Sequence, residues 1–246
     1  MNPIFQQKYE IAPIHADCFG RTKTSTLLHF AQEAAGEHCY QLSVDWDTLS
    51  KQHLFWAVIR TKMQIVRQPT VGEKITVETW PMPTTRSAFP RSTVGYDEKG
   101  NEVFRAISLW VLMDTEKRAM LLPGKSGIAL NGTLRGTELA APGSLHPVTA
   151  THSRHRKVCY TDLDRNGHMN NTRYMDWLDD LLPAQFHAAN PVKELTLCYL
   201  SEALEGEETD ICWTLDDENI LHADVLRANG DLCKKQARIF SAEVKF

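Results

Sequence analysis

The chain passes twice through the same order of sequence patterns. Each half opens with a polar turn that ends in glycine, at residues 17–20 in the first half and 164–167 in the second. An amphipathic helical pattern follows in each half, and then several segments rich in β-branched residues. A stretch with five glycines and three prolines, residues 115–155, separates the halves. This order predicts a duplicated unit of one helix wrapped by an antiparallel sheet, an α+β fold.

Caps and apolar spacing mark the two predicted helices. In the first half Thr24 or Ser25 is the expected N-cap, and Leu, Ala and His side chains then recur at steps of three and four residues. In the second half Asn170 or Asn171 is the expected N-cap of a helix that Pro183 ends or kinks. Both patterns have one apolar stripe, which is typical of a helix packed on a sheet.

The segments after each helix have the composition of strands. Two of them flank residues 97–101, whose Asp, Lys, Gly and Asn predict a hairpin turn, and Asn229-Gly230 predicts a tight turn before the last strand. The predicted strands are residues 75–80, 92–96, 102–112, 195–200, 210–215 and 220–227.

The Gly- and Pro-rich stretch sets the expected domain boundaries. Periodic apolar patterning fades there, as in a connection that crosses a surface. We therefore expect an N-terminal domain over residues 1–118, a linker over 119–150 and a C-terminal domain over 151–246. Each of the two segments is long enough to form a small domain with its own core.

Composition and charge disfavour several classes of protein. Lys and Arg number 27 and Asp and Glu 31, so the formal net charge of −4 argues against a strongly basic nucleic-acid binder. No apolar run approaches the roughly 18 residues needed to cross a bilayer, and the first ten residues do not resemble a signal peptide. The six cysteines include no C-x-x-C pair, so free thiols are expected and a metal cluster is the weaker alternative. We expect a cytoplasmic protein without stable membrane insertion.

The densest polar stretch, residues 161–171, carries the candidate catalytic residues. Asp164, Asn166 and His168 alternate, so on an extended backbone they would face one side. An imidazole can act as a base, a carboxylate can fix its tautomer, and an amide or a helix N-terminus can polarise a carbonyl oxygen. Glu202, at the end of a predicted strand, is a second acid. Each residue alone fits an ordinary turn, cap or strand end, whereas the group favours catalysis.

Other chemistries find less support in the sequence. G-x-S-x-G, the P-loop and G-x-G-x-x-G are absent, which argues against those hydrolase and nucleotide-binding designs. Neither H-E-x-x-H nor a paired C-x-x-C supports catalytic zinc, and no cofactor is predicted. The basic run 152–157, with Arg154, Arg156 and Lys157, fits a solvated loop or a docking site for an anionic partner.

Residues 164–171 resemble the catalytic stretch D-x-N-x-H-x-N-N of the acyl-ACP thioesterases (ACP, acyl carrier protein), a family of plant enzymes and bacterial relatives. Residues 194–203 are similar to the family's E-L-T-L-E-Y-R-R-E-C strand, and the resemblance covers about residues 5–240. Matches in the first half occur at Asp17, Gly20, Leu27, Leu28, Gln32, Glu33, Arg60, Pro69, Gly72, Glu73, Thr79, Trp80 and 108–114.

The resemblance implies two tandem hotdog domains, each a long central helix wrapped by a curved antiparallel β-sheet. It implies hydrolysis of fatty acyl-ACP to free fatty acid and holo-ACP without a cofactor, with the first domain shaping the acyl pocket. The family's catalytic group corresponds by position to Asp164, Asn166, His168 and Glu202.

The implied partner is ACP, which is acidic in this family. Basic side chains are then docking candidates, while self-association as a homodimer stays open. The candidates are Arg154, Arg156 and Lys157, with Lys234 and Lys235 as alternatives.

One position departs from the plant members, which often have cysteine where this chain has Ala203. Alanine has no nucleophilic atom, and Cys198 lies five residues earlier, on the opposite face of an ideal strand. The sequence therefore favours activated water over a thiolate as the nucleophile.

Two alternative functions use the same fold. An acyl-CoA thioesterase would have the same catalytic group and a different carrier. A non-catalytic hotdog protein could bind acyl thioesters as a sensor, but the chain shows no basic helix-turn-helix segment of the kind such regulators usually need. The sequence leaves open the acyl chain length and whether His168 or Glu202 is the base.

Overall fold

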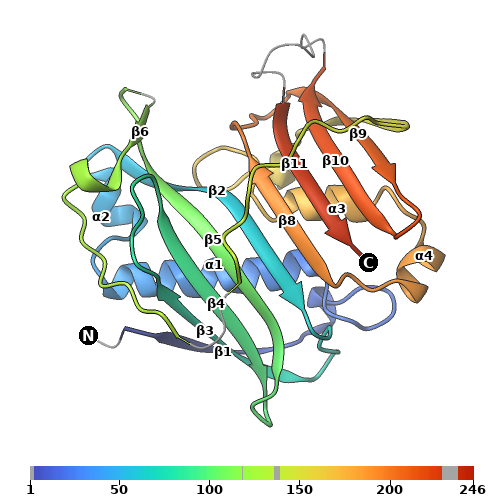
Figure 1. Ribbon diagram of the computed structural model, residues 1–246, viewed down its shortest axis with the longest axis horizontal. Helices are drawn as coiled ribbons and strands as arrows, with labels where there is room; N and C mark the ends of the chain where they lie inside the picture. The colour runs from blue at the N-terminus through green and yellow to red at the C-terminus, as the bar shows by residue number, and fades with distance from the viewer. Residues whose placement is uncertain (1–2, 118, 136–138, 229–237) are drawn as a thin grey trace. The chain divides into compact units, whose positions relative to one another are not determined.

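The structure, a computed structural model, describes residues 3–117, 119–135, 139–228 and 238–246. The chain divides into two compact units, Met1–Pro142 and Gly143–Phe246 (Figure 1). Within the described residues, no helix combines the length and the apolar character needed to cross a bilayer.

The first unit consists of a long helix packed on an antiparallel sheet. Helix α1 (Thr24–Gln41) crosses one face of the sheet and contacts β1 and β3 (Figure 1). Its buried stripe includes Leu27, Phe30 and Ala34, and the Phe30 ring stacks on Tyr9 with 4.1 Å between centroids. The strand order is β1 (Phe5–Glu10), β3 (Lys74–Pro81), β4 (Phe89–Asp97), β5 (Glu102–Asp114) and β2 (Leu54–Ile65), with β6 (Ala119–Leu121) on β5.

Short helical turns complete this unit. They are η1 (Pro13–His15), α2 (Trp46–Ser50) and η2 (Pro123–Lys125). The predicted caps of the long helix are wrong by one or two positions: Lys23, with extended backbone, is the N-cap, and it makes no side-chain cap bond. Thr24 and Ser25 lie inside the helix and are buried, because the chain turns into the helix one residue earlier than the polar side chains indicate.

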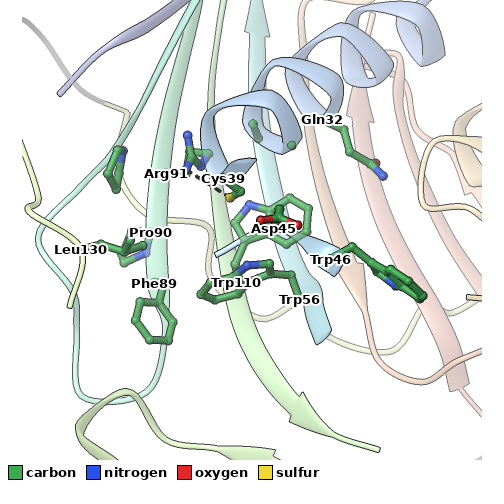
Figure 2. Close-up of a pocket in the computed structure, with 13 residues that line it drawn as sticks. Gln32, Cys39, Asp45, Trp46, Trp56, Phe89, Pro90, Arg91, Trp110 and Leu130 are labelled. Carbon is green, nitrogen blue, oxygen red and sulfur yellow. Dashed lines mark hydrogen bonds between the residues drawn. The ribbon is translucent and has the colours of Figure 1, made fainter. Parts of the chain in front are cut away.

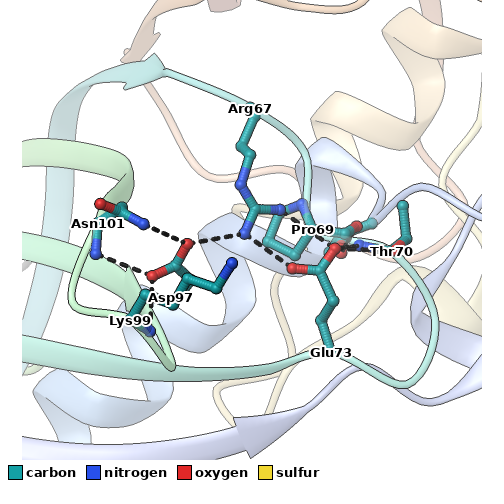
Figure 3. A network of polar contacts seen from close by, with 8 residues as sticks. Arg67, Pro69, Thr70, Glu73, Asp97, Lys99 and Asn101 are labelled. Atoms are coloured by element: carbon teal, nitrogen blue, oxygen red, sulfur yellow. Dashed lines mark hydrogen bonds and ion pairs between the residues drawn. The ribbon is translucent and has the colours of Figure 1, made fainter.

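The predicted hairpin turn between β4 and β5 is confirmed, and Asp97 closes it. Asp97 accepts hydrogen bonds from the backbone of Lys99 (3.0 Å) and from the backbone and side chain of Asn101 (2.8 and 3.1 Å). Arg67 Nη2 bridges Asp97 Oδ2 (3.2 Å) and Glu73 Oε2 (2.8 Å) (Figure 3). The hydrogen bond from the Asn101 side chain, with backbone N–H groups and Arg67, holds the pKa of Asp97 at about 2.

Part of the expected linker is packed against the first unit. Ile128 and Leu130 contact the core cluster of Leu49, Leu54, Phe89 and Leu112. The backbone N of Thr133 donates to Pro81 O (2.9 Å). At Gly132 an added Cβ would lie 2.3 Å from the backbone N of Pro83, so only glycine fits this close approach.

The second unit repeats the plan with shorter helices. Its strand order is β8 (Glu194–Tyr199), β11 (Arg238–Lys245), β10 (Ile220–Arg227), β9 (Glu208–Leu215) and β7 (His152–Lys157), and all pairs are antiparallel. Helix α3 (Arg173–Asp179) follows η3 (Tyr160–Asp162) and buries Tyr174, Met175, Trp177 and Leu178. The Tyr174 ring stacks on Phe240 with 4.3 Å between centroids. The predicted turn at Asn229-Gly230 lies outside the described residues.

The second helix is shorter than the long helix expected there, at 7 residues. Its N-cap is Thr172, because Asn170 Oδ1 accepts the Thr172 backbone N–H (2.9 Å) and closes a turn before the helix begins. Proline has no N–H and disfavours helical backbone in the residue before it. Pro183 therefore separates α3 from a second short helix, α4 (Ala184–Ala189), for which it is the N-cap.

Candidate active site

The loop between η3 and α3 is folded into a tight turn. Leu163 and Met169 form a β-bridge, Asp164 N donates to His168 O (2.8 Å), and Gly167 N donates to Asp164 O (3.0 Å). Gly167 has φ +75°, a backbone region that favours glycine. The expectation that residues 164, 166 and 168 alternate along extended backbone is therefore wrong, because a turn, not a strand, brings them together.

The Asp164 carboxylate organises this turn. Its Oδ1 accepts the backbone N–H of Asn166 (2.8 Å) and lies 3.4 Å from the backbone N of His168. Its Oδ2 accepts from the Asn166 side-chain amide at 3.4 Å. Aspartate commonly bonds to the backbone two residues ahead in turns. Asp164 thus orients both the Asn166 amide and the backbone that carries His168.

A second segment brings Glu202 to the same loop. Met169 N donates to Ala203 O (2.8 Å), and His168 forms a β-bridge with Leu204. His168 Nε2 lies 3.5 Å from Glu202 Oε2. Their side chains are 24% and 34% exposed, so water can reach both. An imidazole beside a carboxylate can take a proton from such a water molecule.

Arg227, at the end of β10, holds the segment that carries Glu202. Its Nη2 donates to the backbone oxygen of Glu202 (2.6 Å), and its Nη1 donates to Ser201 Oγ (3.0 Å). Its Nε forms an ion pair with Glu207 Oε2 (3.2 Å). Arg227 is not among the site residues predicted from the sequence, where its only signal is a charge at the end of a predicted strand.

The N-terminus of helix α3 lies farther along the chain than the sequence predicted. Helix α3 begins at Arg173, five positions beyond His168, and the Thr172 N–H is already bonded to Asn170. A helix of 7 residues also has a smaller aligned dipole than a long one. The candidate group is therefore the side chains of the turn and Glu202.

The buried cysteine of β8 lies away from solvent. Cys198 is 1% exposed, and its Sγ donates to the backbone oxygen of Gly143 (3.6 Å). Ala203, which has no nucleophilic atom, is 2% exposed. Among the residues that the structure describes, no three His, Cys, Asp or Glu side chains are grouped to hold a metal ion.

The docking candidates on β7 all have partners. Arg154 donates to Asp180 O, and Arg156 Nη1 pairs with Asp180 Oδ2 (2.8 Å). Lys157 Nζ pairs with Glu208 Oε1 (3.3 Å). These acids offset part of the positive charge of the strand. The alternative candidates, Lys234 and Lys235, lie outside the described residues.

A cavity of about 220 Å³ lies in the first unit, lined by residues of α1, β4, β5 and neighbouring segments (Figure 2). Its walls include the aromatic side chains of Trp56, Phe89 and Trp110, and Arg91 also lines it. None of these residues belongs to the site predicted from the sequence. The sequence feature that could have indicated this cavity is Arg91, the one charged residue among the otherwise uncharged residues 88–92.

Two family descriptions match the chain. The acyl-ACP thioesterase N-terminal domain matches residues 2–122, and the acyl-ACP thioesterase C-terminal domain matches residues 145–241. Together they cover more than half of the chain, and the N-terminal domain match precedes the C-terminal one.

Plant relatives and a bacterial structure agree with these matches. A palmitoyl-acyl carrier protein thioesterase of Gossypium hirsutum is 25% identical over 89% of this chain and 57% of the relative. A dodecanoyl-[acyl-carrier-protein] hydrolase of Umbellularia californica is 28% identical over 80% of this chain and 54% of the relative. The chain thus spans about half the length of these curated relatives.

The crystal structure of an acyl-ACP thioesterase from Bacteroides thetaiotaomicron superposes with a TM-score of 0.88 at 22% identity, covering 100% of this chain and 98% of that one. This likeness confirms the α+β fold of two tandem hotdog units that the resemblance implied. The two domain matches show that the chain belongs to the acyl-ACP thioesterase family.

Proposed function

We propose that this protein hydrolyses the thioester of fatty acyl-ACP and releases free fatty acid and holo-ACP. The observation that carries the proposal is the distance of 3.5 Å between His168 Nε2 and Glu202 Oε2, beside the turn that Asp164 organises. Membership of the acyl-ACP thioesterase family supports this reaction and carrier.

In the proposed mechanism, water is the nucleophile. Glu202 and His168 activate the water by accepting its proton, and its oxygen adds to the thioester carbonyl carbon. Asn166 donates a hydrogen bond to the carbonyl oxygen as negative charge develops there. Asp164 positions Asn166 through the hydrogen bond at 3.4 Å. The carbon–sulfur bond then breaks, and the departing thiolate of the carrier takes the proton that the Glu202–His168 pair accepted from the water.

We propose that the two units have different functions, catalysis in one and acyl-chain binding in the other. The C-terminal domain expected from the sequence, residues 151–246, supplies the catalytic group, and the cavity of the first unit takes acyl carbons. Aromatic and aliphatic walls suit an acyl chain, since each buried methylene contributes about 0.8 kcal/mol. The β7 residues Arg154, Arg156 and Lys157 are the proposed contacts for the acidic carrier.

A carrier comparison tests the function. Purified protein is given saturated acyl-ACP substrates of graded length and, in parallel, the matching acyl-CoA substrates, and free acid and free thiol are measured together. We expect free acid and thiol in equal amounts from acyl-ACP, with higher kcat/KM than from acyl-CoA. Glu202→Gln should abolish most release. Equal or better turnover of acyl-CoA would identify CoA as the carrier, and stoichiometric binding without release would identify a sensor.

A further inference from the structure

The cavity of the first unit contains a buried cation. The Arg91 side chain comes from β4 and is 5% exposed (Figure 2). Its Nη1 lies 3.2 Å from His38 Nδ1 and donates to Thr79 Oγ1 (3.3 Å), and its Nη2 donates to Cys39 Sγ (3.7 Å). In the described part of the chain, no carboxylate lies within ion-pairing distance of this guanidinium.

All three neighbours of Arg91 are neutral. A guanidinium can only donate, so His38 Nδ1 must accept, and an imidazole with an unprotonated nitrogen carries no charge. The Thr79 hydroxyl donates to Ser92 O (2.9 Å). Burial raises the pKa of the Cys39 thiol above its ordinary value, so it is protonated at neutral pH. The Arg91 guanidinium is therefore hydrogen-bonded to three neutral groups, and none of them neutralises its positive charge.

The rest of the cavity is mainly apolar. Trp56, Phe89, Trp110 and Leu130 provide walls on which an aliphatic chain can pack. The other charged group in the lining, Asp45, is occupied as the N-cap of α2, where it accepts from the backbone N (3.1 Å) and hydroxyl (2.8 Å) of Thr48. Arg91 is thus the group in the cavity lining that would bind an anion.

A buried charge without a counter-ion is unfavourable, and proteins usually pair such a charge or use it to bind a ligand. We propose that the cavity binds an aliphatic chain that ends in a carboxylate, with the carboxylate on Arg91 and the methylenes against the aromatic walls. A charge-assisted hydrogen bond between carboxylate and guanidinium is stronger than a neutral one, and a guanidinium has five N–H donors. The bonds of Arg91 to His38, Thr79 and Cys39 use three of them and leave two for the carboxylate.

Two kinds of ligand could supply the carboxylate that binds Arg91. One is the far carboxylate of an acyl group that is still attached to its carrier at the other end, and this source rests on the proposed function. The other is a free fatty acid that enters with its carboxylate first, and this source does not depend on catalysis. Both place the same group on Arg91.

Calorimetry with the full chain tests the proposal. Decanoate and 1-decanol have the same chain and differ in the charged end. We expect decanoate to bind roughly 10- to 100-fold more tightly, the ratio that a hydrogen-bonded charge typically provides. Arg91→Met should remove this difference and leave decanol binding unchanged, and Arg91→Lys should keep part of it. Arg86→Met, at an exposed arginine of the loop before β4, is the matched control.

Equal affinity of the wild type for the two ligands would overturn the proposal, as would an Arg91→Met protein that keeps its melting temperature and its preference for decanoate. Two turnover measurements assign the source. If the wild type hydrolyses the ACP mono-thioester of decanedioic acid faster than decanoyl-ACP, and Arg91→Met loses this preference, the source is the far carboxylate of the acyl substrate. If free decanoate inhibits hydrolysis of decanoyl-ACP by the wild type, and the inhibition is weaker in Arg91→Met, the source is the free fatty acid. Absence of any thioester hydrolysis would contradict the proposed function but not the binding result.

Discussion

Arg227 Nη2 lies 2.6 Å from the backbone oxygen of Glu202, so a side chain at the end of β10 holds the segment that carries the proposed catalytic carboxylate. The same guanidinium is fixed by Ser201 Oγ (3.0 Å) and by Glu207 Oε2 (3.2 Å). Because the His168–Glu202 distance of 3.5 Å depends on where this segment lies, we regard Arg227 as a positioning residue.

Arg227→Met should lower kcat by about 10- to 100-fold with little change in KM, because small displacements of a catalytic group are costly. Steady-state kinetics on acyl-ACP measure this split, and Arg227→Lys should restore part of kcat. Arg105→Met is the control, since Arg105 forms a comparable pair with Glu102 in the other unit. A rise in KM alone would show that Arg227 acts on binding and not on the position of Glu202.

Asn166→Ala should reduce turnover by about 10²- to 10³-fold, the usual cost of losing one donor to a developing oxyanion. Its thermal unfolding should stay close to that of the wild type. Asn101→Ala is a matched control, because Asn101 also donates its amide to an aspartate in a turn, at 3.1 Å. Undiminished turnover in Asn166→Ala would remove this amide from the mechanism.

His168→Ala and Glu202→Ala should each lower kcat by about 10²- to 10⁴-fold, the usual contribution of a general base. Profiles of kcat/KM against pH distinguish the two residues. The variant that loses the base loses the rise in activity that the wild type shows with pH, whereas the variant that loses its partner keeps this rise at a lower rate. Normal activity in either variant would exclude that residue from catalysis.

Reversing the charges at Arg154, Arg156 and Lys157 to glutamate should raise KM for acyl-ACP, because an acidic carrier would then be repelled. The loss should become smaller as salt increases, since exposed charges are screened over about 10 Å at 0.1 M. KM for a carrier-free acyl thioester should not change.

The control for this experiment reverses three exposed lysines of the first unit, Lys74, Lys99 and Lys117. That protein has the same net charge as the β7 variant, so a general charge effect would raise KM in both. An unchanged KM in the β7 variant would show that the carrier docks elsewhere.

Asp97→Asn should destabilise the protein at pH 6 and have little effect at pH 2. The pKa of Asp97 is about 2 in the folded chain, against an ordinary value of 3.8, so the ionised form favours folding. That stability is fully present above about pH 4 and is lost as the pH falls through about 2. Urea unfolding at pH 6, 4 and 2 measures it, and Glu98→Gln in the same turn is the control. A difference in stability that does not vary with pH would contradict the assignment.

The sequence by itself determined the features that depend on neighbouring residues. The turn that Asp97 closes and the break at Pro183 follow from local chemistry, since turn side chains bond within a few residues and proline cannot continue a helix. The clustering of Asp164, Asn166 and His168 is also local, although a tight turn and not an extended strand produces it.

Tertiary structure decided what depends on segments far apart in the chain. The approach of His168 to Glu202 follows from backbone pairing between two loops, and the clamp from Arg227 follows from the place of β10 in the sheet. The burial of Arg91 in an aromatic cavity likewise requires α1, β4 and the segment after η2 to come together. Such contacts arise from packing and strand register across the whole unit, and no pattern of adjacent residues encodes them.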